Sequence, residues 1–158
     1  EAYFVNGDYQ TALNGDAYGF EGFIFLSEQY KSTKAGKLAG LYAGLCYAQL
    51  DSMNLAEKYL AKFSGKDQMV APAAVGALAN CYATNGQLDK AAATFEKAAK
   101  QANNNLLSPN FYFQAGLIYE SMGKTSQALK LYNLVKTNYP ASFESQDIDK
   151  YISRLSSK

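Results

Sequence analysis

The chain has 158 residues, and 48% of them are hydrophobic, which is enough to form one ordinary folded domain. Its 15 basic and 14 acidic side chains leave a net charge of +1 and are scattered along the sequence, so the charge pattern indicates neither a nucleic-acid-binding nor a membrane-binding surface. The longest apolar runs, such as residues 23–26, are too short to span a bilayer. The chain starts at Glu1 rather than at Met, and we expect an upstream segment to have been removed.

The first 36 residues, 1–36, are expected to form a degenerate helical repeat. A helix from Gly7 to Leu13 is followed at 14–19 by Asn-Gly-Asp-Ala-Tyr-Gly, a composition typical of a loop. A second helix is predicted over residues 20–30.

Three regular units follow, at residues 37–71, 72–108 and 109–141. Each has a Tyr after an apolar helical run, an Ala nine residues later, and an apolar or aromatic residue four positions further on. In the unit at 37–71 these column residues are Tyr47, Ala56 and Leu60; in the next they are Tyr82, Ala91 and Phe95; and in the last they are Tyr119, Ala128 and Tyr132. We interpret each unit as two antiparallel helices, in which the small residues Gly44, Ala79 and Gly116 let the first helix approach the second.

The turn between the two helices of each unit also has a recognisable sequence. Asn85-Gly86 and Met122-Gly123 supply residues that accept a left-handed backbone after a helix. Leu50-Asp51 takes this place in the first unit and is a weaker stop signal.

These columns resemble the tetratricopeptide repeat, whose signature places Trp, Leu, Gly, Tyr, Ala, an aromatic residue and Pro at fixed spacing. The unit at 109–141 is the most similar, with Tyr112 in the Trp column and Pro140 at the end, whereas Gly40 leaves the first unit without the bulky opening residue. The resemblance implies an all-α fold, a right-handed α-solenoid of antiparallel helix pairs. Residues 142–158 are predicted to be a capping helix, because apolar residues recur there at helical spacing.

No catalytic, metal or cofactor site is predicted, and we expect that the protein is not an enzyme. The chain has no His, which excludes Ser-His, Cys-His and His-ligated metal arrangements. Gly15, Gly19 and Gly22 match no phosphate-binding loop. Cys46 and Cys81 share one column of adjacent units, and we expect two buried thiols rather than a disulfide, because neighbouring helices lie about 8 to 10 Å apart.

The resemblance also implies that the first helix of each pair lines a concave groove that binds a protein or peptide partner. By column, the predicted groove residues are Leu38, Leu41, Leu45, Ala73, Gly76, Asn80, Asn110, Phe113 and Leu117. This lining is largely apolar and favours an apolar partner segment, with Phe113 as the preferred contact. The alternative is that Leu38, Leu41 and Leu45 only pack on the degenerate first repeat.

A second resemblance covers nearly the whole chain. The order of the short segments at 6–9, 12–16, 22–23, 33–36 and 148–152 is similar to that in a group of Bacteroidetes tetratricopeptide repeat proteins. Those proteins carry an N-terminal transmembrane helix and are similar in layout to the ancillary subunit of the bacterial Sec translocon. This resemblance implies a periplasmic location, anchored to the inner membrane by a helix absent from this chain, and an exported or Sec-associated partner. A cytoplasmic location is the alternative, weakly favoured by two reduced thiols.

The leading functional hypothesis is therefore a non-catalytic protein–protein interaction module of the bacterial cell envelope. The alternative is a self-associating scaffold, a homo-oligomer that mates through residues 20–26 or through the C-terminal helix. Neither hypothesis includes a nucleic acid, a metal or a cofactor.

Overall fold

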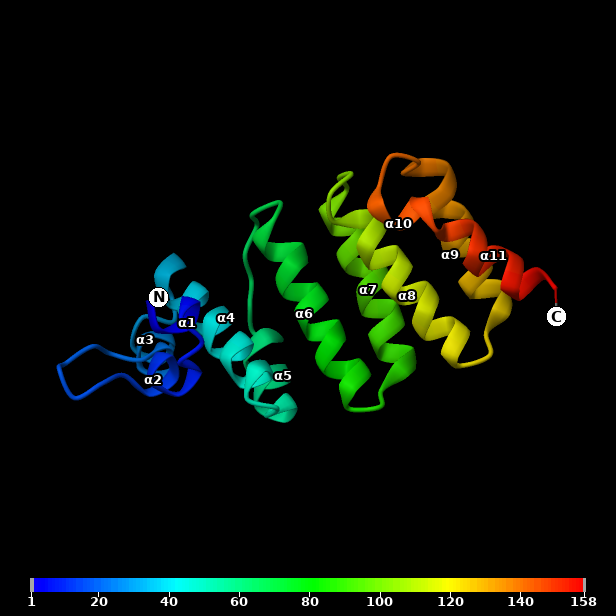
Figure 1. Ribbon diagram of the computed structural model, residues 1–158. Helices are drawn as coiled ribbons and strands as arrows, with labels where there is room; N and C mark the ends of the chain where they lie inside the picture. Colours follow the sequence, from blue (N-terminus) through cyan, green and yellow to red (C-terminus); the bar gives the residue numbers. More distant parts are fainter. Residues whose placement is uncertain (1, 158) are drawn as a thin grey trace. The chain divides into compact units, whose positions relative to one another are not determined.

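The computed structural model describes residues 2–157, and these are folded as a series of α-helices (Figure 1). The chain divides into two compact units, one ending at Cys81 and the other starting at Tyr82. Helix α6 (Val70–Thr84) contains this division, and each unit is described separately. None of the helices between residues 2 and 157 is long and apolar enough to cross a membrane.

The first unit opens with three short helices, α1 (Ala2–Val5), α2 (Tyr9–Asn14) and α3 (Phe23–Gln29). The predicted order of helix, loop and second helix is confirmed, but the bounds differ. Helix α1 was not predicted, α2 begins two residues later than expected and extends to Asn14, and α3 begins three residues later. The loop is ordered by Asp16, whose carboxylate accepts hydrogen bonds from the backbone N–H of Tyr18 at 2.8 Å and of Phe20 at 3.1 Å.

Helices α4 (Lys34–Gln49) and α5 (Met53–Leu60) form the first regular pair, and α4 lies between α3 and α5 (Figure 1). Thr33 caps α4 by accepting a hydrogen bond from the N–H of Gly36 at 3.0 Å. Ala56 is completely buried, and the tight approach of the two helices at Gly44 agrees with the prediction from its column.

The second unit contains α7 (Leu88–Ala102), α8 (Ser108–Ser121) and α9 (Thr125–Asn138), with α8 packed between the other two (Figure 1). Ala91 and Ala128 are completely buried, as their column predicts. The ring of Tyr132 lies against Gly116, where a Cβ atom would come within 2.5 Å of Cε1. The predicted all-α solenoid class, built from consecutive packed helices, is therefore confirmed.

The predicted left-handed turns are also present. Gly86 and Gly123 have φ angles of +73° and +70°, and Asp51 takes the equivalent place in the first unit with φ +56°. An Asp accepts this conformation at some cost, which explains why Leu50-Asp51 is the weaker sequence signal.

The C-terminal capping helix was predicted to be continuous, but the structure shows two helical segments. It is divided at Asp147 into α10 (Phe143–Gln146) and α11 (Ile148–Ser156). Asp147 has φ −110° and ψ +3°, so the backbone leaves the helical conformation between the two segments. Within the second unit, α11 packs against α9 and buries Ile148 and Leu155.

Candidate partner-binding surfaces

The predicted groove residues of α4 differ widely in exposure. Leu38 is 41% exposed, Leu45 is half-buried, and Leu41 is only 6% exposed. Leu41 and Leu45 lie in an apolar cluster that includes Leu60 of α5 and Cys81 of α6. Of these three side chains, Leu38 is therefore the most accessible to a partner.

The predicted groove residues of α6 are small or polar. Ala73 and Asn80 are exposed, whereas Gly76 is buried. Their neighbours Ala74 and Cys81 join the apolar cluster around Leu60, so this part of α6 belongs to the packing of the first unit.

In the second unit, the C-terminal helices contact two of the predicted groove residues. The side-chain amide of Asn110 donates a hydrogen bond to Oε1 of Glu144 in α10, at 3.0 Å. The ring of Phe113 meets Tyr151 of α11 edge-on, with the ring centroids 4.9 Å apart. Leu117 is partly exposed. The contact of the C-terminal helix α11 with Phe113, the preferred contact residue, was not predicted from the sequence.

A polar network fixes α11 in this position. Glu120 of α8 accepts hydrogen bonds from the hydroxyl of Tyr132 and from Arg154, both at 2.8 Å. The guanidinium of Arg154 also lies 4.9 Å from the ring centroid of Tyr151. Burial raises the pKa of Tyr132, and the carboxylate of Glu120 raises it further, so the phenol stays neutral and donates to Glu120 at physiological pH.

One pocket of the first unit includes a predicted groove residue. Leu38, Phe63 and Val70 give it an apolar lining, and its volume is about 650 Å³. The charged groups at its margin are Lys34, Lys37, Lys66 and Asp67. The carboxylate of Asp67 accepts the backbone N–H groups of Met69 and Val70, both at 2.8 Å, and these hydrogen bonds lower its pKa.

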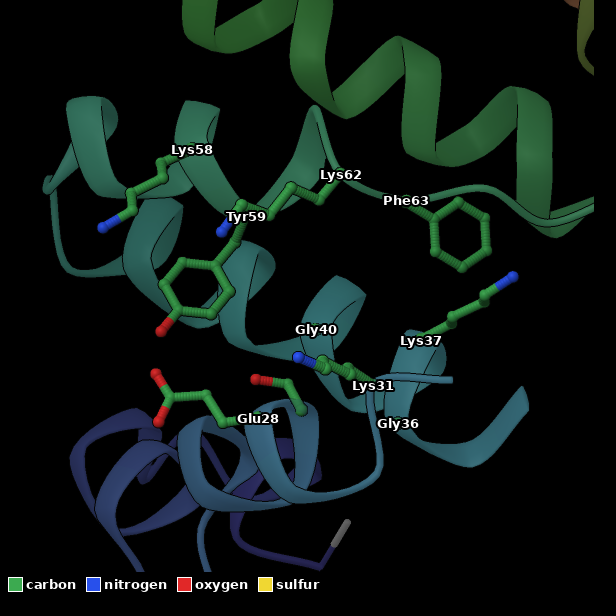
Figure 2. A pocket seen from close by; sticks show the side chains of 10 residues that line it. Glu28, Lys31, Gly36, Lys37, Gly40, Lys58, Tyr59, Lys62 and Phe63 are labelled. Atoms are coloured by element: carbon green, nitrogen blue, oxygen red, sulfur yellow. The ribbon is translucent and has the colours of Figure 1, made fainter. Parts of the chain in front are cut away.

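A second pocket lies between α3, α4 and α5, and its volume is about 360 Å³. Figure 2 shows the phenol of Tyr59 and the carboxylate of Glu28 facing each other across this space. Lys62 lies beside the ring of Tyr59, with Nζ 6.0 Å from the ring centroid. The complete lining is Ser27, Glu28, Lys31, Gly36, Lys37, Gly40, Lys58, Tyr59, Lys62 and Phe63.

The two pockets share Lys37 and Phe63, and together they gather lysines that are distant in the sequence. The first 81 residues contain six basic side chains, and every one of them lines one of these pockets: Lys31, Lys34, Lys37, Lys58, Lys62 and Lys66. The charges are scattered along the sequence, and this surface was not predicted. The sequence does contain a signal for this surface. The lysines recur every three residues within 31–37 and every four within 58–66, and these are the spacings that place side chains on one face of a helix.

The two cysteines are structural rather than reactive. Cys46 and Cys81 are buried and do not form a disulfide, in agreement with the prediction. Burial raises the pKa of Cys46 to about 11 and also raises that of Cys81, so both thiols are protonated at neutral pH. Within residues 2–157, no group of three or more Cys, Asp or Glu side chains is arranged to hold a metal ion.

Comparison with protein families identifies two segments of the chain. Residues 73–105 and residues 111–142 each match a tetratricopeptide repeat model. The comparisons with curated proteins and with solved structures gave no match. Tetratricopeptide repeats are generally non-catalytic binding modules, and their presence indicates a protein–protein interaction module. The chain therefore contains tetratricopeptide repeats at residues 73–105 and 111–142.

Proposed function

We propose that this protein binds a partner protein through the surface around Leu38 in its first unit. The observation that carries the proposal is the position of Leu38 in a predicted groove column and, at the same time, at the edge of an open pocket of about 650 Å³. Phe63 and Val70 extend the apolar lining, so the pocket accommodates an apolar side chain from a partner segment.

Predicted groove residues of α6 and α8 are further proposed contacts for a partner. Asn80 is exposed on α6, and Leu117 is partly exposed on α8, so both are proposed partner contacts. Asn110 and Phe113 have a different proposed role, since their contacts with Glu144 and Tyr151 position the C-terminal helices.

The proposed setting is the bacterial cell envelope. It rests on the resemblance of the segments at 6–9, 12–16, 22–23, 33–36 and 148–152 to the Bacteroidetes group described above. In this proposal an N-terminal helix outside the chain anchors the protein on the periplasmic side of the inner membrane, and the partner is an exported or Sec-associated protein. Protease accessibility of the protein in spheroplasts, compared with intact and lysed cells, tests this location.

In-cell photo-crosslinking tests the binding proposal directly. A photoreactive residue at Leu38 is expected to capture one partner protein reproducibly. The matched control carries the same residue at Lys130, an exposed position of α9 outside the predicted groove columns. Identical products from both positions would contradict a specific surface around Leu38.

Self-association is the alternative function, and one observation favours it. Tyr18, Phe20 and Phe25 are 90%, 67% and 47% exposed, so the N-terminal segment presents a group of aromatic side chains to solvent. Sedimentation equilibrium distinguishes the two proposals: a mass of 17.2 kDa at all concentrations supports a monomeric binding module, whereas a mass that doubles with concentration supports the scaffold.

A further inference from the structure

The pocket between α3, α4 and α5 exists because one repeat column lacks its large side chain. In the repeat at 109–141 the column is occupied by Tyr112, which is 8% exposed and packs with the ring of Tyr139 at 6.3 Å. Seventy-two residues earlier the same column holds Gly40, and Gly40 lines the pocket. The helices α3, α4 and α5 therefore leave open the kind of space that an aromatic ring fills between α7, α8 and α9.

The two glycines Gly40 and Gly44 of α4 differ in how much space surrounds them. A Cβ atom on Gly44 would come within 2.7 Å of Leu60, so Gly44 is required by the helix packing. A Cβ atom on Gly40 would meet only Cβ of Ser27, at an ordinary contact distance of 3.7 Å. Close packing therefore explains Gly44 and does not explain Gly40.

The rim of this pocket is cationic and open to ligands. Lys31, Lys37, Lys58 and Lys62 all line it and are all exposed. None of the four has an ion pair within 4.0 Å among the residues that the structure describes. Glu28 is the one carboxylate in the lining. Four like charges around a concave site raise the local concentration of anionic groups.

We propose that this pocket binds an acidic segment of a partner protein, which inserts one aromatic side chain over Gly40 and pairs its carboxylates with the surrounding lysines. The inserted ring lies against Tyr59 and Phe63 and takes the place that Tyr112 fills within its own repeat. The carboxylates of the same segment lie at the rim, where each ion pair adds a small amount of affinity.

This site shares Lys37 and Phe63 with the pocket at Leu38, but Leu38 itself does not line it. A protein ligand is favoured over a nucleic acid or a lipid surface because the space is concave and large enough for one side chain.

Fluorescence anisotropy with the full chain tests the proposal with defined probes. The first probe is a fluorescein-labelled peptide of Asp and Glu with one central Phe, the second has Ala in place of Phe, and the third has Lys in place of the acidic residues. We expect saturable binding of the first, about tenfold weaker binding of the second, and none of the third. Added salt is expected to weaken the first two.

Variants assign this binding to the pocket. Gly40→Tyr fills the space and is expected to remove the preference for Phe over Ala, while circular dichroism verifies the fold; Gly40→Leu serves if the larger side chain prevents folding. Lys58→Gln is expected to weaken binding about threefold. The matched control is Lys130→Gln, which changes the same column of the third repeat and is expected to have no effect.

Each remaining outcome overturns the proposal. Equal affinity for the Phe and Ala peptides would show a diffuse cationic surface without a side-chain pocket. No saturation at millimolar peptide would exclude the site. Tighter binding of oligo(dT) or of anionic phosphatidylglycerol vesicles, lost in Lys58→Gln, would assign the lysines to a nucleic acid or a membrane. A concentration-dependent increase in mass, abolished by Gly40→Tyr, would identify the occupant as a second copy of this chain.

Discussion

Gly44 of α4 and Leu60 of α5 are in such close contact that a methyl group on Gly44 would lie 2.7 Å from Cγ and 2.9 Å from a Cδ atom of Leu60. Gly116 and Tyr132 repeat this relationship between α8 and α9. Two helices of a pair can approach in this way only if one of them has no side chain at the crossing point. Glycine lowers the intrinsic stability of a helix, but at Gly44 and Gly116 the close packing of the two helices requires it.

Alanine substitutions at the two glycines of α4 are expected to have opposite effects on stability. Gly44→Ala overpacks the contact with Leu60 and is expected to lower the free energy of unfolding by about 1 to 3 kcal/mol. Gly40→Ala meets no obstacle and is expected to raise it by about 0.5 to 1 kcal/mol, because Ala favours the helix. Urea unfolding of both variants measures this, and destabilisation by Gly40→Ala would show that the space over Gly40 is not open.

Phe113 is expected to contribute mainly to stability. Its ring contacts Tyr132 and Tyr151, so Phe113→Ala removes an aromatic cluster that holds α11 and is expected to cost about 2 kcal/mol. Amide hydrogen exchange over residues 148–156 is expected to accelerate in the same variant. Unchanged exchange in α11 would mean that Phe113 is not needed there, and its predicted role as a partner contact would be favoured again.

Tyr119 is expected to make stability fall at alkaline pH. Burial, together with the hydrogen bond of its hydroxyl to Oε1 of Glu96 at 2.9 Å, raises the pKa of Tyr119 to about 12, compared with 10.0 in the unfolded chain. A raised pKa means that the unfolded state loses its proton first. The contribution of the neutral phenol is therefore complete below pH 10 and is lost between pH 10 and pH 12.

Tyr119→Phe provides the comparison for this pH dependence. The variant lacks the hydrogen bond and is expected to be about 1 kcal/mol less stable than the wild type at neutral pH. This difference is expected to shrink above pH 10 and to change sign before pH 12, because only the wild type has a phenol whose pKa rises on folding, from 10.0 to about 12. A difference that stays constant over the whole range would contradict the raised pKa.

The cysteines are expected to be unreactive in the folded protein. Cys46 and Cys81 are at most 1% exposed, and burial raises the pKa of both thiols, so the thiolate is scarce and inaccessible at pH 8. Titration with Ellman's reagent is expected to give slow labelling without denaturant and two rapid equivalents in urea. Rapid labelling of either thiol in the native protein would contradict the buried positions.

The repeat columns could be predicted from sequence because they depend on contacts within one helix pair. Ala56, Ala91 and Ala128 recur at fixed distances from a Tyr, and all three are completely buried. Such a pattern repeats wherever the same pair of helices repeats, so it can be recognised without knowing the fold.

The binding surfaces could be predicted only in part, because they depend on how successive elements pack. Lys31 and Lys58 are 27 residues apart in the sequence and reach one pocket only after α3, α4 and α5 have packed together. In the same way, no local pattern indicates that Tyr151 lies on Phe113. Leu41 occupies a groove position of the repeat but is buried in a cluster with Leu60 and Ala74.

The central claim, that a partner protein binds the first unit around Leu38, is tested most directly by amide hydrogen exchange of the chain with and without the partner captured at Leu38. We expect slower exchange in the partner-bound state over the first turns of α4 and α6, next to Leu38 and Val70, with no change over residues 125–138 of α9. Slower exchange restricted to the C-terminal helices, or none in the first unit, would contradict the claim.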